Sequence, residues 1–287
     1  MKINSKIVGK SVTEPDLTLL IPAYNEEKRI GPVLRQYATY FRENYSGKFQ
    51  ILVVLNGCRD NTLGVVRDIA QQYPEISYID IPDPIGKGGA IIEGLKQAPK
   101  CSVIGFVDAD GATPPHAFHD LVKHLPTHDC VVASRWIKGA ILHQQQSIKR
   151  RIASRVFHII VELLFRLGIK DTQCGAKVIK YEAVKKILPF LCIADMAFDI
   201  NLLYSLKRAG YKIAEVPTEW TDIAGSKVVL LRTALSMLLS VIRLRLVYSP
   251  FYKYLRPLRP IEKWLYKKLR SPQPLPSNPE DRSADKT

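Results

Sequence analysis

The sequence predicts an α/β protein built on a doubly wound, mostly parallel sheet. Short apolar runs rich in valine and isoleucine recur along the first half of the chain, and segments with helical spacing of apolar residues separate them. A length of 287 residues with 46% apolar content allows one large domain to bury a core. Strands that alternate with helices are typical of a parallel sheet, whose ligands bind at the carboxyl ends of the strands. The runs cover residues 17–22, 50–55, 77–82, 102–108 and 130–135.

The segments between these runs predict helices. In the first of them, Asn25 is expected to cap the helix, and Glu26 and Glu27 to complement its positive end. After residue 135 the alternation breaks, so the second half is expected to elaborate on the first. The predicted helices cover residues 26–44, 60–73, 86–98 and 114–125. The second half should contain a basic helix near 147–167, a strand around 174–180, helices near 181–188 and 198–209, and a strand around 212–220.

The charge is strongly basic but confined to two segments. The chain has 42 lysine and arginine residues against 27 acidic residues, a net charge of +15. Residues 135–155 contribute +6 and residues 227–270 contribute +10, which leaves the rest of the chain at −1. This distribution favours local anionic partners, such as phosphates or a lipid surface, over general nucleic-acid binding.

The C-terminal region combines apolar and basic residues. In residues 228–248, Arg232, Ser236, Ser240 and Arg243 fall on one helical face, and the remaining face is broad and apolar. The arginines interrupt it before the ~20 apolar residues that a membrane span needs. A core helix is one interpretation, and an interfacial helix lying in the membrane plane is the favoured one. The predicted organisation is a polar arm at 1–16, an α/β domain at 17–226, basic amphipathic interfacial helices at 227–270 and a disordered tail at 271–287.

Cysteine usage and the N-terminal residues indicate a cytosolic setting. The five cysteines show no C-x-x-C pair and no regular spacing, so they predict neither a disulfide framework nor a zinc site. The first sixteen residues are polar and lack the apolar core of a secretory signal. With the C-terminal region, this predicts a peripheral protein at the cytoplasmic face of a membrane.

Two acidic residues follow the fourth apolar run. Asp108 and Asp110 stand two positions apart in FVDADGA, so both carboxylates are expected on one side. Mg²⁺ or Mn²⁺ prefers one or two carboxylates plus diphosphate oxygens and water. A metal that bridges a nucleotide diphosphate is therefore one interpretation, and two solvated loop acids are the other.

Three further turns carry candidate binding residues. Tyr24 offers an aromatic wall for a nucleoside base, and Glu26 offers an acceptor for a ribose or base edge. Asn56 follows the second run, where a nucleoside is expected to lie. Lys87 belongs to the glycine-rich turn IGKGGA, whose free amides are suited to phosphate although it is not a Walker A loop.

Seven motifs, taken together, resemble family 2 glycosyltransferases of the GT-A fold, and more narrowly the dolichyl-phosphate β-glucosyltransferase and polyprenyl-phosphate sugar synthase branch. The resemblance covers roughly residues 17–248 and implies metal and diphosphate binding by Asp108 and Asp110. It also places Pro22, Ala23, Tyr24 and Glu26 in the turn that binds the nucleoside. The motifs are IPAYNE, GKGGA, DADGA, ASRW, DTQCGAK, MAFDI and EWTDIAGSK, in this order within residues 20–227.

The resemblance implies an inverting hexosyltransferase that moves a sugar, expected to be glucose from UDP-glucose, onto a polyprenyl or dolichyl phosphate. Such an acceptor is already an anion, so cations rather than a general base are expected around it. Arg135 and Lys227 are predicted to serve the lipid phosphate, with pairing of Arg135 and Lys177 to Asp171 or Asp199 as the structural alternative. Within the motifs, the remaining site residues are expected to be Ala109, Gln173, Lys177 and Asp199.

The chain departs from the family pattern at two positions. The usual D-D-G-S turn is replaced by Leu55-Asn56-Gly57-Cys58, and the usual F-D-V-E by Phe198-Asp199-Ile200-Asn201. These differences concern the nucleotide base and the donor sugar.

Three other functions compete with this interpretation. A soluble GT-A enzyme acting on a protein, glycan or small molecule would not need the basic, apolar C-terminal region. A membrane or nucleic-acid-binding protein that is not an enzyme would exploit the charge of +15, yet no nucleic-acid motif is present. A sugar-1-phosphate nucleotidylyltransferase would need a basic glycine-rich loop after the first strand, where this chain has AYNEE.

Overall fold

The computed structural model describes residues 6–9, 12–143, 148–221 and 230–249, with side chains left out at 148–152 and 230–236. The chain divides into two compact units, residues 1–228 and 229–287. The first unit holds the α/β fold, and the described part of the second is helix α8 (Leu230–Val247).

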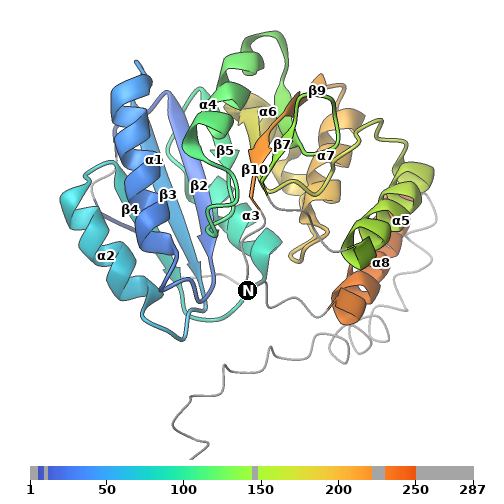
Figure 1. Cartoon of the computed structure of the whole chain (residues 1–287), viewed down its shortest axis with the longest axis horizontal. Coiled ribbons are helices and arrows are strands. Elements are labelled where there is room, and N and C mark those ends of the chain that lie inside the picture. The colour runs from blue at the N-terminus through green and yellow to red at the C-terminus, as the bar shows by residue number, and fades with distance from the viewer. Residues whose placement is uncertain (1–5, 10–11, 144–147, 222–229, 250–287) are drawn as a thin grey trace, which may run out of the picture. The chain divides into compact units, whose positions relative to one another are not determined.

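The main sheet of the first unit is mostly parallel, as the sequence predicts (Figure 1). Strands β4, β3, β2 and β5 run parallel to one another, and β6 runs parallel to β9. Each of the five apolar runs forms a strand of this sheet. In spatial order the described strands are β1 (Ile7–Val8), β4 (Ile76–Ile81), β3 (Phe49–Asn56), β2 (Leu17–Ala23), β5 (Val103–Phe106), β8 (Lys177–Lys180), β6 (Cys130–Ser134) and β9 (Ile213–Pro217).

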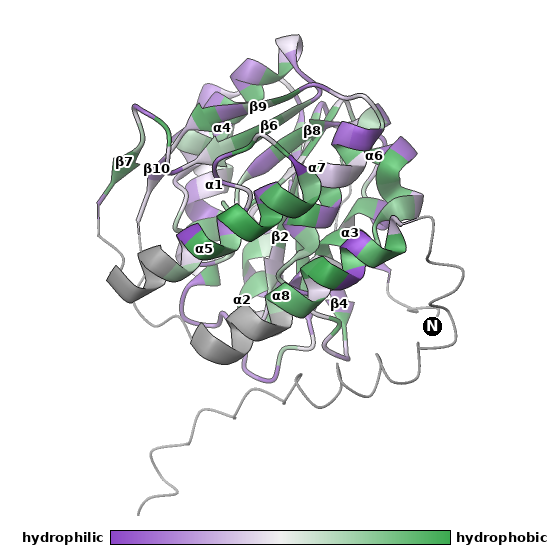
Figure 2. Cartoon of the chain, turned by 90° about the vertical axis from the view of Figure 1, so that its right-hand side faces the viewer, coloured by the Kyte–Doolittle hydropathy of each residue, from purple (hydrophilic) through white to green (hydrophobic). Residues whose placement is uncertain are grey.

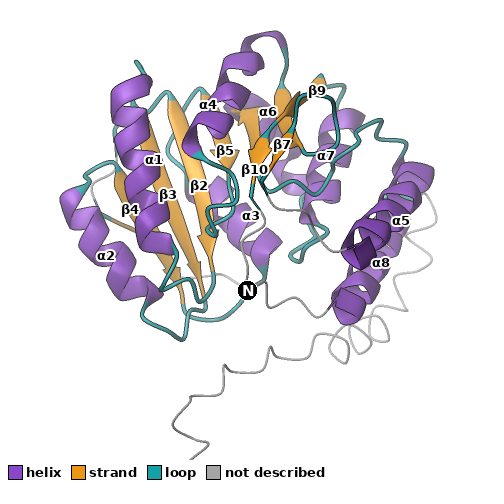
Figure 3. Ribbon diagram, viewed as in Figure 1, coloured by secondary structure: helices purple, strands orange, loops and turns teal. Residues whose placement is uncertain are grey.

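Helices cover the sheet in two layers (Figure 3). One layer contains α1, which contacts both α2 and α4, and the other contains α7, which contacts both α3 and α6. Apolar residues at helical spacing, such as Val33, Leu34, Tyr37 and Phe41 of α1, face the sheet and are buried. The first layer is α1 (Ile30–Asn44), α2 (Thr62–Gln72) and α4 (Pro115–His124). The second is α3 (Lys87–Gln97), α6 (Tyr181–Ile187) and α7 (Phe198–Arg208).

Strand β8 is the feature of the sheet that the alternating pattern does not predict. It lies between β5 and β6 and is antiparallel to both, with Lys177 opposite Phe106 and Val132. Because β8 runs the other way, its first residue lies at the edge where β5 and β6 end. The DTQCGAK motif therefore reaches the carboxyl edge of the sheet from the opposite direction.

Smaller elements surround this sheet. Strand β1 lies within the predicted N-terminal arm and pairs antiparallel with β4. Strands β7 (Ile141–Leu142) and β10 (Glu219–Trp220) form a separate parallel pair. The 3₁₀ helices η1 (Leu125–Thr127) and η2 (Leu188–Phe190) follow α4 and α6.

Two long helices each overlap one of the basic segments. Helix α5 (Ile148–Phe165) corresponds to the predicted basic helix, and Val156, Ile159 and Leu163 are exposed on it. Figure 2 shows hydrophobic and hydrophilic residues along the coloured parts of α5 and α8. Among the described residues, no helix is long and apolar enough to cross a bilayer. Residues 250–287, with most of the predicted interfacial segment and the tail, lie outside the described residues, and the interfacial role stays a prediction.

Candidate active site

Several predicted site residues of the described chain come from turns that share one edge of the sheet. Strands β2, β3, β5 and β6 all end at this edge, and β8 begins there. Parallel strands bring their carboxyl ends together, which is why turns far apart in sequence meet.

The acidic loop after β5 contains Asp108 and Asp110, whose charges interact. Lys87, the first residue of α3, lies 2.5 Å from Asp108 through its Nζ and Oδ1 atoms. Asp110 accepts a hydrogen bond of 3.0 Å from the backbone N–H of Ala112. The glycine turn IGKGGA therefore meets the acidic loop through Lys87, as expected of a site that holds a diphosphate.

The electrostatics of this loop follow from two close carboxylates. Burial and the neighbouring Asp108 carboxylate raise the pKa of Asp110 above its ordinary value. Burial alone would lower the pKa of Lys87, but the carboxylates of Asp108 and Asp199 raise it overall. Two carboxylates that repel each other are stabilised by a divalent cation bound between them, so the pair is suited to such a cation.

The donor set around the loop fits Mg²⁺ or Mn²⁺. The two carboxylates supply hard oxygen ligands, and the described residues contain no cluster of three or more His, Cys, Asp or Glu side chains that would complete a metal site. A cation held here would take its remaining ligands from diphosphate oxygens and water, which is the mode Mg²⁺ prefers.

Gly175 has no side chain and so leaves room for the Asp108 carboxylate. A Cβ atom at this position would come within 2.2 Å of Asp108 Oδ2. The glycine of DTQCGAK therefore lets the start of β8 approach the acidic loop closely. Sequence reasoning missed this residue, because the contact depends on the reversed direction of β8.

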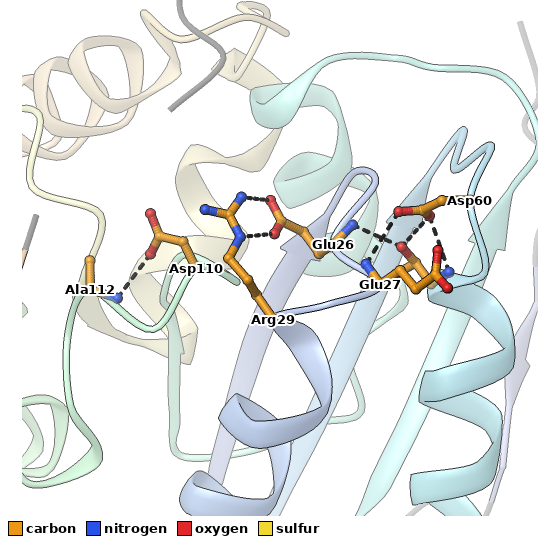
Figure 4. Close-up of polar contacts among 7 residues, drawn as sticks. Glu26, Glu27, Arg29, Asp60, Asp110 and Ala112 are labelled. Carbon is orange, nitrogen blue, oxygen red and sulfur yellow. Dashed lines mark hydrogen bonds and ion pairs between the residues drawn. The ribbon is translucent and has the colours of Figure 1, made fainter. Parts of the chain in front are cut away.

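The turn after β2 is tied to the turn after β3. The backbone N–H of Glu26 donates to Thr62 Oγ1 at 2.8 Å, and that of Glu27 donates to Asp60 Oδ2 at 3.2 Å. Arg29 forms a bidentate ion pair with Glu26, with Nε to Oε2 at 2.6 Å and Nη2 to Oε1 at 2.7 Å (Figure 4). The turn is therefore held by hydrogen bonds to the neighbouring turn and by the ion pair within itself.

The predicted capping role of Asn25 is wrong. Helix α1 begins at Ile30, and its N-cap residue Arg29 makes no side-chain capping bond. Asn25 instead has a positive φ of 55° and accepts a hydrogen bond from the Arg59 N–H at 2.8 Å. Asparagine tolerates this left-handed conformation, and its short amide reaches the neighbouring turn.

The remaining predicted nucleoside residues occupy the same edge. Pro22 and Ala23 end β2, and Tyr24 follows them half-buried. Asn56 ends β3 buried, and its Oδ1 accepts a hydrogen bond of 2.8 Å from the Ile85 N–H. Asn56 therefore holds the turn that leads to Lys87, in addition to its predicted role toward the nucleoside.

Arg135 forms the ion pair that the structural alternative predicts. Its Nε lies 2.7 Å from Asp171 Oδ2 and its Nη2 lies 2.9 Å from Oδ1, while its guanidinium stacks over Trp220 at 5.1 Å from the ring centre. The pKa of Asp171 is lowered, because the hydrogen bonds and charge of Arg135 outweigh burial. The predicted contact of Arg135 with a lipid phosphate stays a prediction.

Lys177 also forms its expected pair. Its Nζ is buried, lies 2.6 Å from Asp199 Oδ1 and donates to the Cys174 carbonyl at 2.7 Å. These contacts join the start of β8 to the first turn of α7. Lys177 and Asp199 lie close to the acidic loop, since Asp199 acts electrostatically on Lys87.

Two motif residues beside these pairs have different environments. Asn201, which replaces the glutamate usual in the family, is buried and accepts hydrogen bonds from the N–H groups of Cys192 and Ile193 at 2.7 and 3.1 Å. Gln173 has a buried Nε2 atom with no hydrogen-bond partner among the described residues. That orphaned donor is consistent with its predicted substrate contact. Lys227 lies outside the described residues.

The comparisons with known proteins agree with this geometry. Residues 18–188 match the family model for glycosyl transferase family 2. The chain belongs to this family. It is 33% identical to a dolichyl-phosphate beta-glucosyltransferase of Trichomonas vaginalis over 76% of this chain and 67% of that protein. It is 32% identical to the Homo sapiens dolichyl-phosphate beta-glucosyltransferase over 81% of this chain and 75% of that protein.

Solved structures share the fold of this glycosyltransferase. The glucosyl-3-phosphoglycerate synthase of Mycobacterium tuberculosis, in complex with Mn²⁺, UDP-glucose and phosphoglyceric acid, matches with a TM-score of 0.60 and 16% identity over 80% of each chain. The expected GT-A fold is confirmed.

Proposed function

We propose that this glycosyltransferase transfers glucose from UDP-glucose to dolichyl or a related polyprenyl phosphate, as a peripheral protein at the cytoplasmic face of a membrane. The observation that carries the proposal is the meeting of Lys87, Asp108 and Asp110 at the carboxyl edge of the sheet. The names of the relatives, dolichyl-phosphate beta-glucosyltransferases of several organisms, support the acceptor.

Two positive charges would offset the charge of the leaving diphosphate, one from a divalent cation and one from Lys87. Asp108 and Asp110 would hold a divalent cation, which when bound neutralises charge on the leaving diphosphate. Lys87 lies beside them and supplies a further positive charge where the diphosphate oxygens must lie. The turn at Tyr24 and Glu26 would bind the nucleoside.

The reaction needs no proton transfer from the protein. An oxygen of the acceptor phosphate forms a bond to the anomeric carbon while the bond from that carbon to the diphosphate oxygen breaks, and the nucleoside diphosphate leaves with the electron pair. In-line attack inverts the anomeric centre. Because the attacking phosphate is already an anion, the protein must position two anions in line.

A donor and acceptor panel tests the proposal. The full chain is incubated with Mn²⁺, a polyprenyl phosphate and radiolabelled UDP-glucose, GDP-glucose or GDP-mannose, and label is followed into the organic phase. We expect transfer from UDP-glucose and loss of transfer with a chelator. Transfer to phosphoglyceric acid instead of the lipid would favour the soluble GT-A alternative, and absence of transfer from all donors would contradict the proposal.

The acceptor side is tested separately. Arg135→Ala and Lys227→Ala are each expected to raise the apparent KM for the polyprenyl phosphate more than that for the sugar nucleotide. Lys138→Ala serves as a control, because Lys138 is an exposed cation of the same basic segment. Impaired donor kinetics with normal acceptor kinetics would reverse the assignment.

The membrane contact is tested on vesicles. Each basic residue near an anionic leaflet contributes ~1 kcal/mol to binding, so reversing the charge of Lys263, Lys267 and Lys268 together should release the protein from anionic liposomes. High salt should weaken the contact in the same direction. Equal flotation before and after charge reversal would show that this segment is not the contact.

A further inference from the structure

Arg29 lies between the two parts of the donor site. Its guanidinium forms two hydrogen bonds to the carboxylate of Glu26, at 2.6 and 2.7 Å, and Figure 4 shows it between the side chains of Glu26 and Asp110. The charge of Arg29 also acts on the Asp110 carboxylate. One side chain is thus shared by the nucleoside turn and the acidic loop.

The position of Arg29 follows from the backbone of the turn. The N–H groups of Arg29 and Ile30 both donate to the Glu26 carbonyl at 2.9 Å, which closes the turn that leads into α1. Thr62 fixes the backbone N–H of Glu26 from the neighbouring turn. The backbone of Glu26 is therefore held by Thr62, and its carboxylate is oriented by Arg29.

The same guanidinium would repel a cation bound at the acidic loop. Around the loop, Asp108 and Asp110 face two cations, Lys87 and Arg29. Arginine keeps its charge at all accessible pH values, so it repels a divalent cation whenever one binds nearby. A diphosphate that arrives with the cation adds negative charge and offsets this repulsion.

We propose that Arg29 is a positioning residue with two opposite effects: it orients Glu26 for the donor nucleoside and it weakens binding of a divalent cation before the donor arrives. The inference rests on the proposed function. Its consequence is that metal and sugar nucleotide bind together, because the loop holds the cation weakly until the diphosphate is present. A residue that supported the fold alone would weaken both kinds of binding when removed.

Three variants of the full chain separate the two effects. Arg29→Gln removes the charge, and Arg29→Lys keeps the charge but loses the bidentate geometry. Arg42→Gln is the matched control, because Arg42 forms the same kind of bidentate pair with Glu75 near the other end of α1, at 2.5 and 2.9 Å. Mn²⁺ binding without donor is measured by electron paramagnetic resonance, and UDP-glucose binding with saturating Mn²⁺ is measured by calorimetry.

We expect Arg29→Gln to tighten Mn²⁺ binding by about threefold to tenfold, since removing one like charge beside a hydrated cation site changes affinity by this order. The same variant should weaken UDP-glucose binding by about tenfold, because Glu26 loses its bidentate partner. Arg29→Lys should leave Mn²⁺ affinity within about twofold of the wild type while still weakening UDP-glucose binding. Arg42→Gln should change neither.

Three results would overturn the inference: Mn²⁺ affinity that is unchanged or lower in Arg29→Gln, UDP-glucose affinity that is unchanged in both Arg29 variants, or the same pattern in Arg42→Gln. The proposed function fails independently of these, since it fails when the wild type transfers no sugar to polyprenyl phosphate. The two binding measurements still report on Arg29 in that case.

Discussion

The ion pairs near the active site differ in how exposed they are to solvent. We call the exposed pair at the acidic loop open and the buried pair at the start of β8 closed. Lys87 and Asp108 form a 2.5 Å pair whose side chains are 19% and 36% exposed, whereas Lys177 and Asp199 form a 2.6 Å pair that is 0% and 4% exposed. The two distances are nearly equal, so exposure separates the pairs. An open pair can exchange its partner for a ligand, whereas opening a buried pair leaves an uncompensated charge.

The difference in exposure leads us to expect that the open groups act on ligands and that the closed pair holds the site in place. The closed pair of Lys177 with Asp199 connects the start of β8 to α7. The open groups are more exposed, and the closed pair supports the loops that carry them. The open groups are Asp108, Asp110, Lys87 and Arg29. The following substitutions test this division, from the largest expected effect on the protein to the smallest.

The open group with the largest expected effect is Asp110. Asp110→Asn should reduce transfer by about a hundredfold or more, because it removes a negative charge that would hold the divalent cation at the diphosphate, while the fold stays intact. Activity is measured with labelled donor and folding by urea unfolding. Asp120→Asn is the control, since Asp120 is an exposed acid paired with Lys123 on α4. Full activity of Asp110→Asn in the presence of a chelator would contradict the metal role.

The closed pair should respond in stability. Asp199→Asn leaves Lys177 buried with an unpaired charge and should lower the free energy of unfolding by about 3–5 kcal/mol. Asp108→Asn, at the open pair, should lower it by about 1 kcal/mol or less. Both are measured by urea unfolding. Equal losses at the two pairs would remove the distinction between open and closed pairs.

A test of positioning compares two glycines. Gly175→Ala places a Cβ against the end of the flexible Asp108 side chain and should reduce transfer by about tenfold to a hundredfold, with stability changed by about 1 kcal/mol or less. Gly105→Ala places a Cβ 2.7 Å from the Lys177 carbonyl oxygen and 2.8 Å from Phe118, so it should mainly destabilise the fold. Transfer rates and urea midpoints are compared. Normal transfer in Gly175→Ala would show that Asp108 tolerates the displacement.

The smallest expected effect is at His119 on α4. This histidine is buried between Tyr40, Phe41 and Tyr45, and burial lowers its pKa below 6.5, with the charge of Lys123 acting in the same direction. The folded state therefore binds this proton less readily than the unfolded state. Its stabilising contribution is complete above about pH 6.5 and is lost as the pH falls further.

To test this, the urea midpoint of unfolding is measured for the wild type and for His119→Phe at about pH 7.5 and at about pH 5.5. The drop between them should be smaller in His119→Phe than in the wild type. An identical drop in both proteins would place the pH dependence elsewhere.

The α/β class, the five core strands and the residues that end them could be predicted from the amino-acid sequence. Alternation of apolar runs with amphipathic helices has a direct physical meaning, since each run must be buried and each helix must cover it. Asp108, Asp110, Lys87 and the turn at Glu26 were predictable because a parallel sheet brings the ends of its strands together. Pairing of Arg135 and Lys177 with Asp171 or Asp199 was predictable as the structural alternative, and the structure assigns the partners.

How these groups face one another depends on the folded arrangement of the strands and could not be predicted. Periodicity carries no information on strand direction, so the reversal of β8 and the contact of Gly175 with Asp108 were not predictable. Local propensity suggested that Asn25 caps a helix, but a hydrogen bond to the next turn along the sheet competes successfully with the cap. The place of Arg29 between Glu26 and Asp110 depends on two turns about 80 residues apart meeting at one edge, and such meetings arise from strand order, which a single sequence does not encode locally.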